Sequence, residues 1–412
     1  MREMKDSGID WIGKIPAHWE IKRFKAFAKT IKGKSYDTLN EPFDGSYKVL
    51  SVECLRQDEA QFYDYVFVDD ENQICTSNDI VVIWDGAGVG EFLKAKDGAL
   101  SSTIAKIQLT NKSVILPYLW YWRYKVEYRL KSIPTGMGIP HLNPTLLNNF
   151  KIAIPPIEEQ QAIANYLDEK TAEIDKQISL LERQQKAYEK LKRSLISQVV
   201  TRGLNPNVPL KDSGIDWIGE IPTHWEVKRF KAFAKTIKGK SYDTLNEPFD
   251  GSYKVLSVEC LRQDEAQFYD YVFVDDENQI CTSNDIVVIW DGAGVGEFLK
   301  AKDGALSSTI AKIQLTNKSV ILPYLWYWRY KVEYRLKSIP TGMGIPHLNP
   351  TLLNNFKIAI PPIEEQQAIA NYLDEKTAEI DEQISNIDKK INAYKRLKQS
   401  LIDEVVTGKR KV

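Results

Sequence analysis

At 412 residues, with 43% hydrophobic and 27% charged side chains, the chain is long enough for two or three domains with cores of their own. Its formal net charge of -1 excludes a uniformly basic nucleic-acid-binding protein, although a local basic patch can still bind DNA. No apolar run approaches the length of a membrane span and no signal peptide is evident, so we expect a soluble cytoplasmic protein without a membrane partner.

The first element along the chain is a lysine-rich segment, KRFKAFAKTI at residues 22–31. Its basic residues alternate with aromatic residues and alanines, which indicates a basic amphipathic helix rather than a buried strand. The segment runs into AKTIKGKS at residues 28–35, which has the outline of a phosphate-binding loop. That loop requires a strand before it and a helix after it, whereas the turn-rich SYDTLNEPFDG follows here. We interpret the segment as a surface for an anionic polymer, with a solvated lysine cluster or an ATPase site as the alternatives.

Short β-strands follow, rich in Val and Ile and bounded by Asp, Gly or Ser. They are SYKVLSV, YVFVDD, DIVVIWD and TIAKIQL. The segment PYLWYWRYKVEYRLKSI at residues 117–133 begins with proline and predicts a helix, and PTGMGIPHLNP after it predicts a turn-rich loop. Together these elements predict an α/β globular domain with a twisted sheet.

No catalytic constellation is evident in this domain. GAGVG at residues 86–90 follows a strand but lacks the third glycine of a dinucleotide fingerprint, so a tight turn is the better interpretation. Asp85, Glu91 and Lys94 resemble a nuclease cluster only loosely, because the Glu–Lys spacing is one residue too long. The histidines have no metal-ligand spacing and the four cysteines form no C-x-x-C pair, which predicts buried, reduced thiols. We therefore expect a noncatalytic chain with no metal site.

A long helix closes the domain. Pro155-Pro156 predicts its start and Arg202-Gly203 its end, about 45 residues later. Apolar residues recur along it at steps of three, four and seven, which is typical of a helix that packs on another helix.

The whole unit occurs twice. Residues 22–175 are identical to residues 228–381, whereas the helices diverge from Lys176 and Glu382 onward. Charges change freely in the divergent part while apolar positions persist, so each helix has the other as its available partner. The sequence thus predicts globular domains at residues 1–155 and 204–361, each followed by a long helix, at 156–203 and 362–412. The apolar stripe consists of Ile163, Leu167, Ile174, Ile178, Leu181, Tyr188, Leu191, Leu195 and Val199, and of Ile369, Leu373, Ile380, Ile384, Ile387, Tyr394, Leu397, Leu401 and Val405.

Several segments resemble the specificity subunits of type I restriction-modification systems. They are SGIDWIGKIPAHWEIKRFKAFAKTIKGKS, DIVVIWDGAGVGEFLKAKDGALSSTIAKI, NPTLLNNFKIAIPPIEEQQAIANYLDEKTAEID and LKRSLISQVVTRG. The resemblance implies two α/β target-recognition domains separated by two conserved spacer helices, which pack antiparallel as a coiled coil with pseudo-two-fold symmetry. It also implies that each domain reads one half of a split site in double-stranded DNA.

The same resemblance implies partners that carry the chemistry. Two methyltransferase subunits dock on the coiled coil, and restriction (translocase) subunits complete the complex. S-adenosylmethionine, ATP and Mg are then bound by those subunits and no cofactor by this chain. Because the two recognition domains are identical, we expect an inverted-repeat target. Two other hypotheses stay open: a two-headed coiled-coil ATPase of the chromosome-maintenance type, and a structural adaptor that does not bind DNA.

DNA contacts are expected from loops of each globular domain. Lysines suit phosphate contacts, whereas Arg, Gln, Ser and Thr can reach base edges. The candidates are Lys25, Lys29, Lys32, Lys34, Ser35, Arg56, Gln57, Lys94, Lys96, Ser101, Ser102, Thr103, Thr135 and Met137, and their copies Lys231, Lys235, Lys238, Lys240, Ser241, Arg262, Gln263, Lys300, Lys302, Ser307, Ser308, Thr309, Thr341 and Met343. Trp11 and Trp19 are interpreted as structural, and Trp120 and Trp122 cannot share one helix face.

Overall fold

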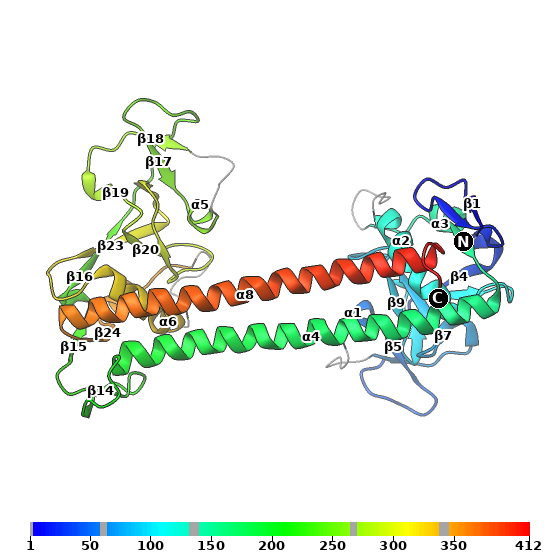
Figure 1. The fold of residues 1–412 in the computed structure, drawn as a ribbon, viewed down its shortest axis with the longest axis horizontal. Coiled ribbons are helices and arrows are strands. Elements are labelled where there is room, and N and C mark those ends of the chain that lie inside the picture. Colours follow the sequence, from blue (N-terminus) through cyan, green and yellow to red (C-terminus); the bar gives the residue numbers. More distant parts are fainter. Residues whose placement is uncertain (1–2, 58–63, 132–139, 264–269, 338–345) are drawn as a thin grey trace. The chain divides into compact units, whose positions relative to one another are not determined.

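The structure, a computed structural model, describes residues 3–57, 64–131, 140–263, 270–337 and 346–412. The chain divides into two compact units (Figure 1). The first unit is Met1–Leu181 together with Lys390–Val412, and the second is Glu182–Lys389. Each unit holds one α/β globe and a segment of both long helices.

The two globes consist of the same elements in the same order. In the first unit the strands are β1 (Met4–Asp6), β2 (Lys14–Pro16), β3 (Glu20–Arg23), β4 (Ala28–Lys32), β5 (Tyr47–Leu50), β6 (Tyr65–Val66), β7 (Ile74–Cys75), β8 (Ile80–Ile83), β9 (Phe92–Lys94), β10 (Gly98–Leu100), β11 (Ile104–Leu109) and β12 (Lys151–Ile154). In the second unit they are β13 (Leu210–Asp212), β14 (Glu220–Pro222), β15 (Glu226–Arg229), β16 (Ala234–Lys238), β17 (Tyr253–Leu256), β18 (Tyr271–Val272), β19 (Ile280–Cys281), β20 (Ile286–Ile289), β21 (Phe298–Lys300), β22 (Gly304–Leu306), β23 (Ile310–Leu315) and β24 (Lys357–Ile360).

Helices connect and cover these strands. The first set is α1 (Val52–Arg56), α2 (Leu116–Lys131), α3 (Pro144–Asn149) and α4 (Ile157–Arg202), and the second is α5 (Val258–Arg262), α6 (Leu322–Lys337), α7 (Pro350–Asn354) and α8 (Ile363–Val406). Short 3-10 helices are η1 (Phe24–Ala26), η2 (Glu71–Gln73), η3 (Phe230–Ala232) and η4 (Glu277–Gln279). The four strands expected from the sequence are thus confirmed as β5, β6, β8 and β11, and the helix expected from residue 117 onward is confirmed as α2.

Each globe contains two four-stranded sheets. One has the order β4-β11-β8-β9 with antiparallel pairs throughout. The other has the order β6-β5-β10-β7, in which β10 runs parallel to β5. Strand β8 is buried along its whole length because Ile80 and Val82 face the core beneath α2 whereas Val81 faces the core shared with the second sheet. The layers are therefore α2, the antiparallel sheet and the second sheet.

The helix expected at residues 22–31 is wrong. The segment forms β3, the η1 turn and then β4, which pairs with β11 from Ala28, opposite Leu109, to Lys32, opposite Ala105. Both Phe24 and Phe27 are buried, at 3% and 0% exposure. Pairing and burial along a neighbouring strand therefore override the helical appearance of a short stretch.

The tryptophans have the structural roles expected of them. Trp19 is fully buried and its indole N–H donates to the Glu159 carboxylate at the start of α4, 3.0 Å away. Trp11 packs edge-on against Trp122, with ring centroids 6.0 Å apart. Trp122 is fully buried in the core and Trp120 is half-buried, so the two do lie on different faces of α2.

In each unit one end of α4 packs against the opposite end of α8, so the two helices run antiparallel. In the first unit Ile163 and Leu167 share a core with Ile402 and Val405. The Lys398 ammonium also pairs with the Asp175 carboxylate at 2.6 Å. In the second unit the same relation holds with the helices exchanged. Ile369, Leu373, Ile196, Val199 and Val200 share its core, and Lys192 pairs with Asp381.

Two residues that were expected to be buried in the apolar stripe are exposed. Leu191 and Leu397 are each 53% exposed. Each lies one residue before the heptad position that faces the other helix, which is occupied by Lys192 and Lys398. The other stripe residues are buried or half-buried. Sequence reasoning missed further buried positions, namely Ile196, Val200, Ile391, Ile402 and Val406.

The four cysteines are free and buried, as expected. Burial raises the pKa of Cys75 and of its copy Cys281 to about 12, so both stay protonated thiols at neutral pH. Within the part of the chain that the structure describes, every helix is too short or too polar to span a bilayer.

Candidate nucleic-acid interface

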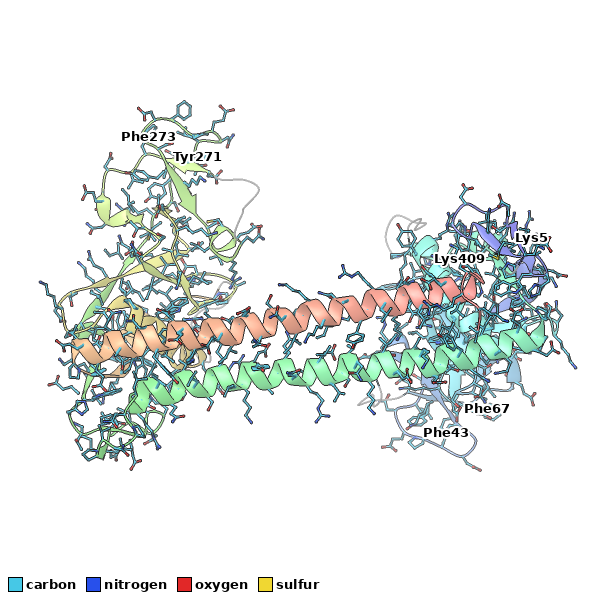
Figure 2. The ribbon with its side chains drawn as sticks, viewed as in Figure 1. Lys5, Phe43, Phe67, Tyr271, Phe273 and Lys409 are labelled. Atoms are coloured by element: carbon cyan, nitrogen blue, oxygen red, sulfur yellow. The ribbon has the colours of Figure 1, made fainter. Side chains whose placement is uncertain are left out.

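Charge is unevenly distributed over each globe. Residues 22–34 carry six basic side chains and no acidic one. Residues 36–57 and 64–79, which build much of the second sheet and its loops, carry nine carboxylates and only two basic side chains. This acidic lobe also presents exposed aromatic residues, Phe43 at 39% and Phe67 at 65% (Figure 2). A polyanion is therefore attracted to the β4 edge and repelled by the acidic lobe.

The segment AKTIKGKS begins as strand β4 and then passes closely over the end of strand β10. β4 forms the first five residues of the motif and leads directly into Gly33, so the helix expected before the glycine is in fact a strand. The Gly33 amide donates to the Ile104 carbonyl at 3.0 Å. A Cβ at Gly33 would collide with the carbonyl groups of Leu100 and Ser101. The glycine thus permits a close approach of two backbones, and residues 35–46 after it contain no helix. This geometry does not form a phosphate-binding loop.

The crossing brings several predicted residues together. Lys34 forms an isolated parallel bridge with Ser101, so the end of β4 lies beside the turn between β10 and β11. In that turn the Ser101 and Thr103 hydroxyls are 3.0 Å apart. The cluster consists of Lys32, Lys34, Ser35, Ser101, Ser102 and Thr103, and in the second unit of Lys238, Lys240, Ser241, Ser307, Ser308 and Thr309. We call it the crossing cluster.

Two residues that the sequence did not single out for DNA contact complete the crossing cluster. Asp85 follows β8 and its amide donates to the Thr103 carbonyl at 3.2 Å. Its carboxylate accepts from the Lys32 ammonium at 2.8 Å and from the His141 Nδ1 at 2.6 Å. Burial opposes ionisation of Asp85, but the hydrogen bonds from His141 and Lys32 outweigh it and lower the pKa of this carboxyl. Asp85 is therefore an ionised acceptor between two donors.

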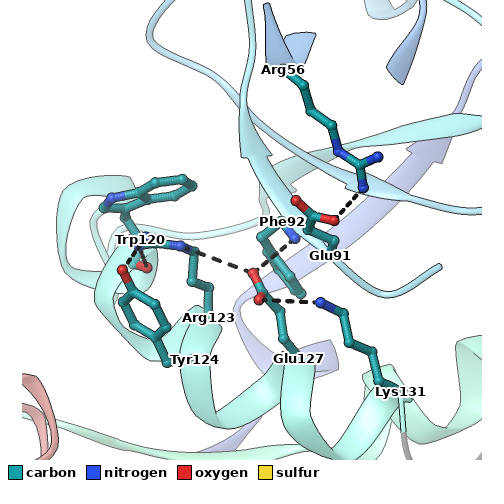
Figure 3. A network of polar contacts seen from close by, with 8 residues as sticks. All are labelled: Arg56, Glu91, Phe92, Trp120, Arg123, Tyr124, Glu127 and Lys131. Atoms are coloured by element: carbon teal, nitrogen blue, oxygen red, sulfur yellow. Dashed lines mark hydrogen bonds and ion pairs between the residues drawn. The ribbon is translucent and has the colours of Figure 1, made fainter. Parts of the chain in front are cut away.

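A second group of candidate residues lies around Glu91, which directly follows the GAGVG turn (Figure 3 shows Glu91 and Arg56). Arg56 at the end of α1 forms an ion pair with Glu91 at 2.5 Å. Gly88 has a φ of +91°, and a Cβ there would lie 2.5 Å from the Arg56 guanidinium. The turn is thus shaped around this arginine, which confirms the structural interpretation of GAGVG. Gln57 is exposed next to Arg56.

Lys96, which is expected to contact a phosphate, has a structural role in this chain. Its ammonium donates to the backbone carbonyls of Cys54 and Gln57 and so ties the end of α1 to the loop between β9 and β10. Its copy Lys302 does the same with Cys260 and Gln263. An ammonium that satisfies two carbonyl groups is not available to a phosphate without breaking them.

Trp120 on α2 is flanked by two cations. The Arg123 guanidinium lies 3.6 Å from the ring centroid and the Lys94 ammonium 5.4 Å (Figure 3 shows the arginine). Glu127 on the next turn accepts from the Phe92 amide at 3.0 Å, and burial raises the pKa of its carboxyl. Lys94 is exposed, so it stays a candidate for DNA contact beside this aromatic platform.

The remaining candidates fall elsewhere. Lys25 on η1 and Lys29 on β4 are exposed, as are their copies Lys231 and Lys235. Thr135, Met137, Thr341 and Met343 lie outside the described residues. The described candidates thus fall into the crossing cluster, the group around Arg56, Lys94 beside Trp120, and the two exposed lysines Lys25 and Lys29, and do not form one constellation. Among the described residues, no group of three or more His, Cys, Asp or Glu is placed to hold a metal ion.

Two α/β globes of the same sequence, each followed by a long helix, make this a protein with two repeated domains and a pair of antiparallel helices. Residues 16–183 and 222–392 both match the model of the type I restriction modification DNA specificity domain. The chain therefore belongs to this family, and the resemblance inferred from its IPAHWE and PPIEEQQAIANYLD segments is confirmed. It carries the domain twice, once in each unit.

Relatives match over almost their whole length. The type I restriction enzyme MjaVIII specificity subunit of Methanocaldococcus jannaschii is 29% identical over 415 residues, which are 97% of this chain and 94% of the relative. The StySPI specificity subunit of Salmonella potsdam is 21% identical over 96% of this chain and 90% of its own. A chain from a structure on complex assembly and conformational transition of the type I R-M system is 14% identical. Its TM-score is 0.69 over 95% of this chain and 98% of that chain, which shows a common fold.

Proposed function

We propose that this chain is the noncatalytic specificity subunit of a type I restriction-modification complex and binds DNA sequence-specifically through its two globes. The family membership supports the DNA role. The observation that assigns DNA binding to particular residues is the crossing cluster. There the basic end of β4 lies beside the hydroxyls of Ser101 and Thr103, and the second globe repeats this arrangement. Lysines there suit phosphates, and hydroxyls suit either phosphates or base edges.

We assign the chemistry to partner subunits. Two methyltransferase subunits on the helices and additional restriction subunits would bind S-adenosylmethionine, ATP and Mg. AKTIKGKS is the segment on which an ATP site in this chain would rest, and its strand crossing at Gly33 favours the partners as ATP-binding subunits. We propose that the chain acts in the cytoplasm, where the DNA and the partner subunits of such a complex would be found.

Because the two globes have identical sequences, we expect them to recognise identical half-sites. Residues 22–175 and 228–381 do not differ at any position, so both globes present the same side chains to DNA. If the antiparallel helices present them in opposite orientations, the target is an inverted repeat with a nonspecific spacer. A binding selection from random DNA, with the full chain and the methyltransferase subunit of its system, should return one half-site twice in inverted order. Two different half-site sequences would contradict the inverted repeat, and no retardation of any DNA pool would overturn the DNA-binding function itself.

Lys34→Ala, together with Lys240→Ala, should weaken DNA binding without changing the preferred sequence. The Lys34 side chain is 59% exposed, and its ammonium lies 3.9 Å from the Asp70 carboxylate, which is a long distance for an ion pair. This pairing is therefore weak, and the charge of Lys34 stays available to a phosphate. Losing one phosphate contact per globe should reduce the slope of log affinity against log salt by about 1 per globe. Lys112→Ala, on the exposed turn between β11 and α2, is the control and should leave that slope unchanged. A changed base preference in the Lys34 variant would mean that this lysine reads bases.

A further inference from the structure

The Arg56 side chain is held at both of its ends. Its backbone forms the last residue of α1, and the Lys96 ammonium binds the carbonyl groups of Cys54 and Gln57 on either side of it. At the other end, the Nη2 of the guanidinium donates to the Glu91 carboxylate at 2.5 Å (Figure 3). The arginine therefore has a fixed orientation before any ligand binds, as a residue that recognises a planar group requires.

Most of this guanidinium remains unused. A guanidinium carries five N–H groups in a planar fork and has no acceptor. Within the described part of the chain Arg56 contacts no acceptor other than Glu91, and that contact uses one hydrogen of Nη2. The Arg56 side chain is 42% exposed and that of Glu91 25%. Glu91 thus holds one corner of the fork, and the remaining N–H groups are open to a ligand from solvent.

The turn between β8 and β9 brings Arg56 close to the crossing cluster. Asp85, which pairs with Lys32 of that cluster, lies near the start of the turn, and Glu91 ends it. The Glu91 carbonyl accepts from the Ile83 amide at 2.8 Å, so Glu91 lies no more than about 12 Å from Asp85. This distance corresponds to about three or four base pairs. A duplex bound at the crossing cluster is therefore within reach of Arg56.

The charge around Arg56 favours a base over a phosphate. Arg56 and Lys48 are the two basic side chains of residues 36–57 and 64–79, which carry nine carboxylates. Such a surface repels the DNA backbone, and one arginine already paired with Glu91 does not reverse its sign. The edge of a base carries no net charge, and it offers acceptors that match the spacing of the fork. The isolated arginine therefore suits recognition of a base.

We propose that Arg56 and Arg262 each read a guanine in the major groove of their half-site. Glu91 and Glu297 are the positioning residues that orient the two guanidinium groups. Guanine presents two acceptors, O6 and N7, on its major-groove edge, which arginine binds in a bidentate way. The second globe repeats the arrangement, with Arg262 and Glu297 2.5 Å apart. The inference rests on the proposed function, because it requires that each globe binds DNA.

Replacing both Arg56 and Arg262 by lysine should lower the preference for guanine at one position of the half-site. Lysine keeps the positive charge but offers one ammonium in place of the planar fork. The test is a binding selection from random DNA with the full chain and the methyltransferase subunit of its system. Enrichment of guanine should fall by about fivefold or more, the low end of what one bidentate contact contributes. Affinity for DNA of random sequence should stay unchanged, because the charge is retained.

Replacing both Glu91 and Glu297 by glutamine tests the positioning role. The amide is of the same size but carries no charge, so it holds the arginine less firmly and no longer repels phosphates. Preference for guanine should fall while affinity for DNA of random sequence rises. A merely structural defect would lower both quantities, so the opposite signs identify a positioning residue.

The matched control replaces Arg23 and Arg229, exposed arginines on β3 and β15, by lysine and should leave the motif unchanged. A selected half-site without guanine, an unchanged motif in the lysine variant of Arg56 and Arg262, or its equal loss of affinity for all sequences overturns the inference while the proposed function stands. If the unaltered chain selects no motif, the proposed function fails first. Should the lysine variant misfold, the glutamine variant decides, and an unchanged preference for guanine there overturns the inference.

Discussion

Gly33→Ala should abolish recognition of one half-site and destabilise the first globe by about 3 kcal/mol. The added Cβ would meet the carbonyl groups of Leu100 and Ser101, which are backbone atoms held in β10 and its turn and cannot rotate away as a flexible side chain can. The end of β4 would be displaced, and with it Lys32, Lys34 and the contact to Asp85. Calorimetry of the full chain should show a transition at lower temperature than in the unaltered protein, and footprinting should lose one half-site.

Two controls come from the chain itself. Gly239→Ala makes the same change in the second globe, where the added Cβ would meet Leu306 and Ser307, and should remove the other half-site to the same extent. Gly45→Ala introduces a Cβ into open space, so only the backbone strain at φ of +73° opposes it, about 1–2 kcal/mol, and both half-sites should be retained. If Gly33→Ala left both half-sites protected, the crossing would not be needed to shape the interface.

The sequence predicts large periodic elements better than short ones. The long helices follow from many repeats of one apolar spacing between Pro155 and Gly203, and the exact repeat of the globe fixes the organisation into two parts. The sequence of strand β4 is too short to distinguish the period of a strand from that of a helix, because its five residues carry lysines on both faces of the strand. Its pairing with β11, more than 70 residues away in the chain, decides the conformation.

The candidate site is predictable only in part for the same reason. Residue type identifies Lys32, Lys34 and Ser101, since lysines and hydroxyls are the usual contacts to DNA. It misses Asp85 and His141, because residue type alone favours neither and 56 positions separate them. Only the isolated bridge between them, after β8 and before α3, places the imidazole on the carboxylate. Charge alone assigns Lys96 to DNA, but the carbonyl groups it binds cannot be located from the sequence.

Leu167→Ala should cost about 2–5 kcal/mol in the free energy of unfolding, whereas Leu191→Ala on the same helix should change it by no more than about 0.5 kcal/mol. Leu167 is fully buried between the first globe and the end of α8, so the truncation leaves a cavity. Leu191 is 53% exposed and buries little surface. Both substitutions exchange the same residues within α4, so helix propensity does not separate them. Urea unfolding followed by circular dichroism measures the difference.

The repeat supplies an independent second pair. Leu373 is fully buried and Leu397 is 53% exposed on α8, and alanine at these two positions should reproduce the same contrast. Equal losses at the buried and the exposed position would show that Leu191 and Leu397 belong to the packed stripe, as the spacing of apolar residues alone suggests. Unequal losses would mean that Lys192 and Lys398 take the inward heptad positions. The helix pair is then held there by their ion pairs to Asp381 and Asp175 as well as by apolar packing.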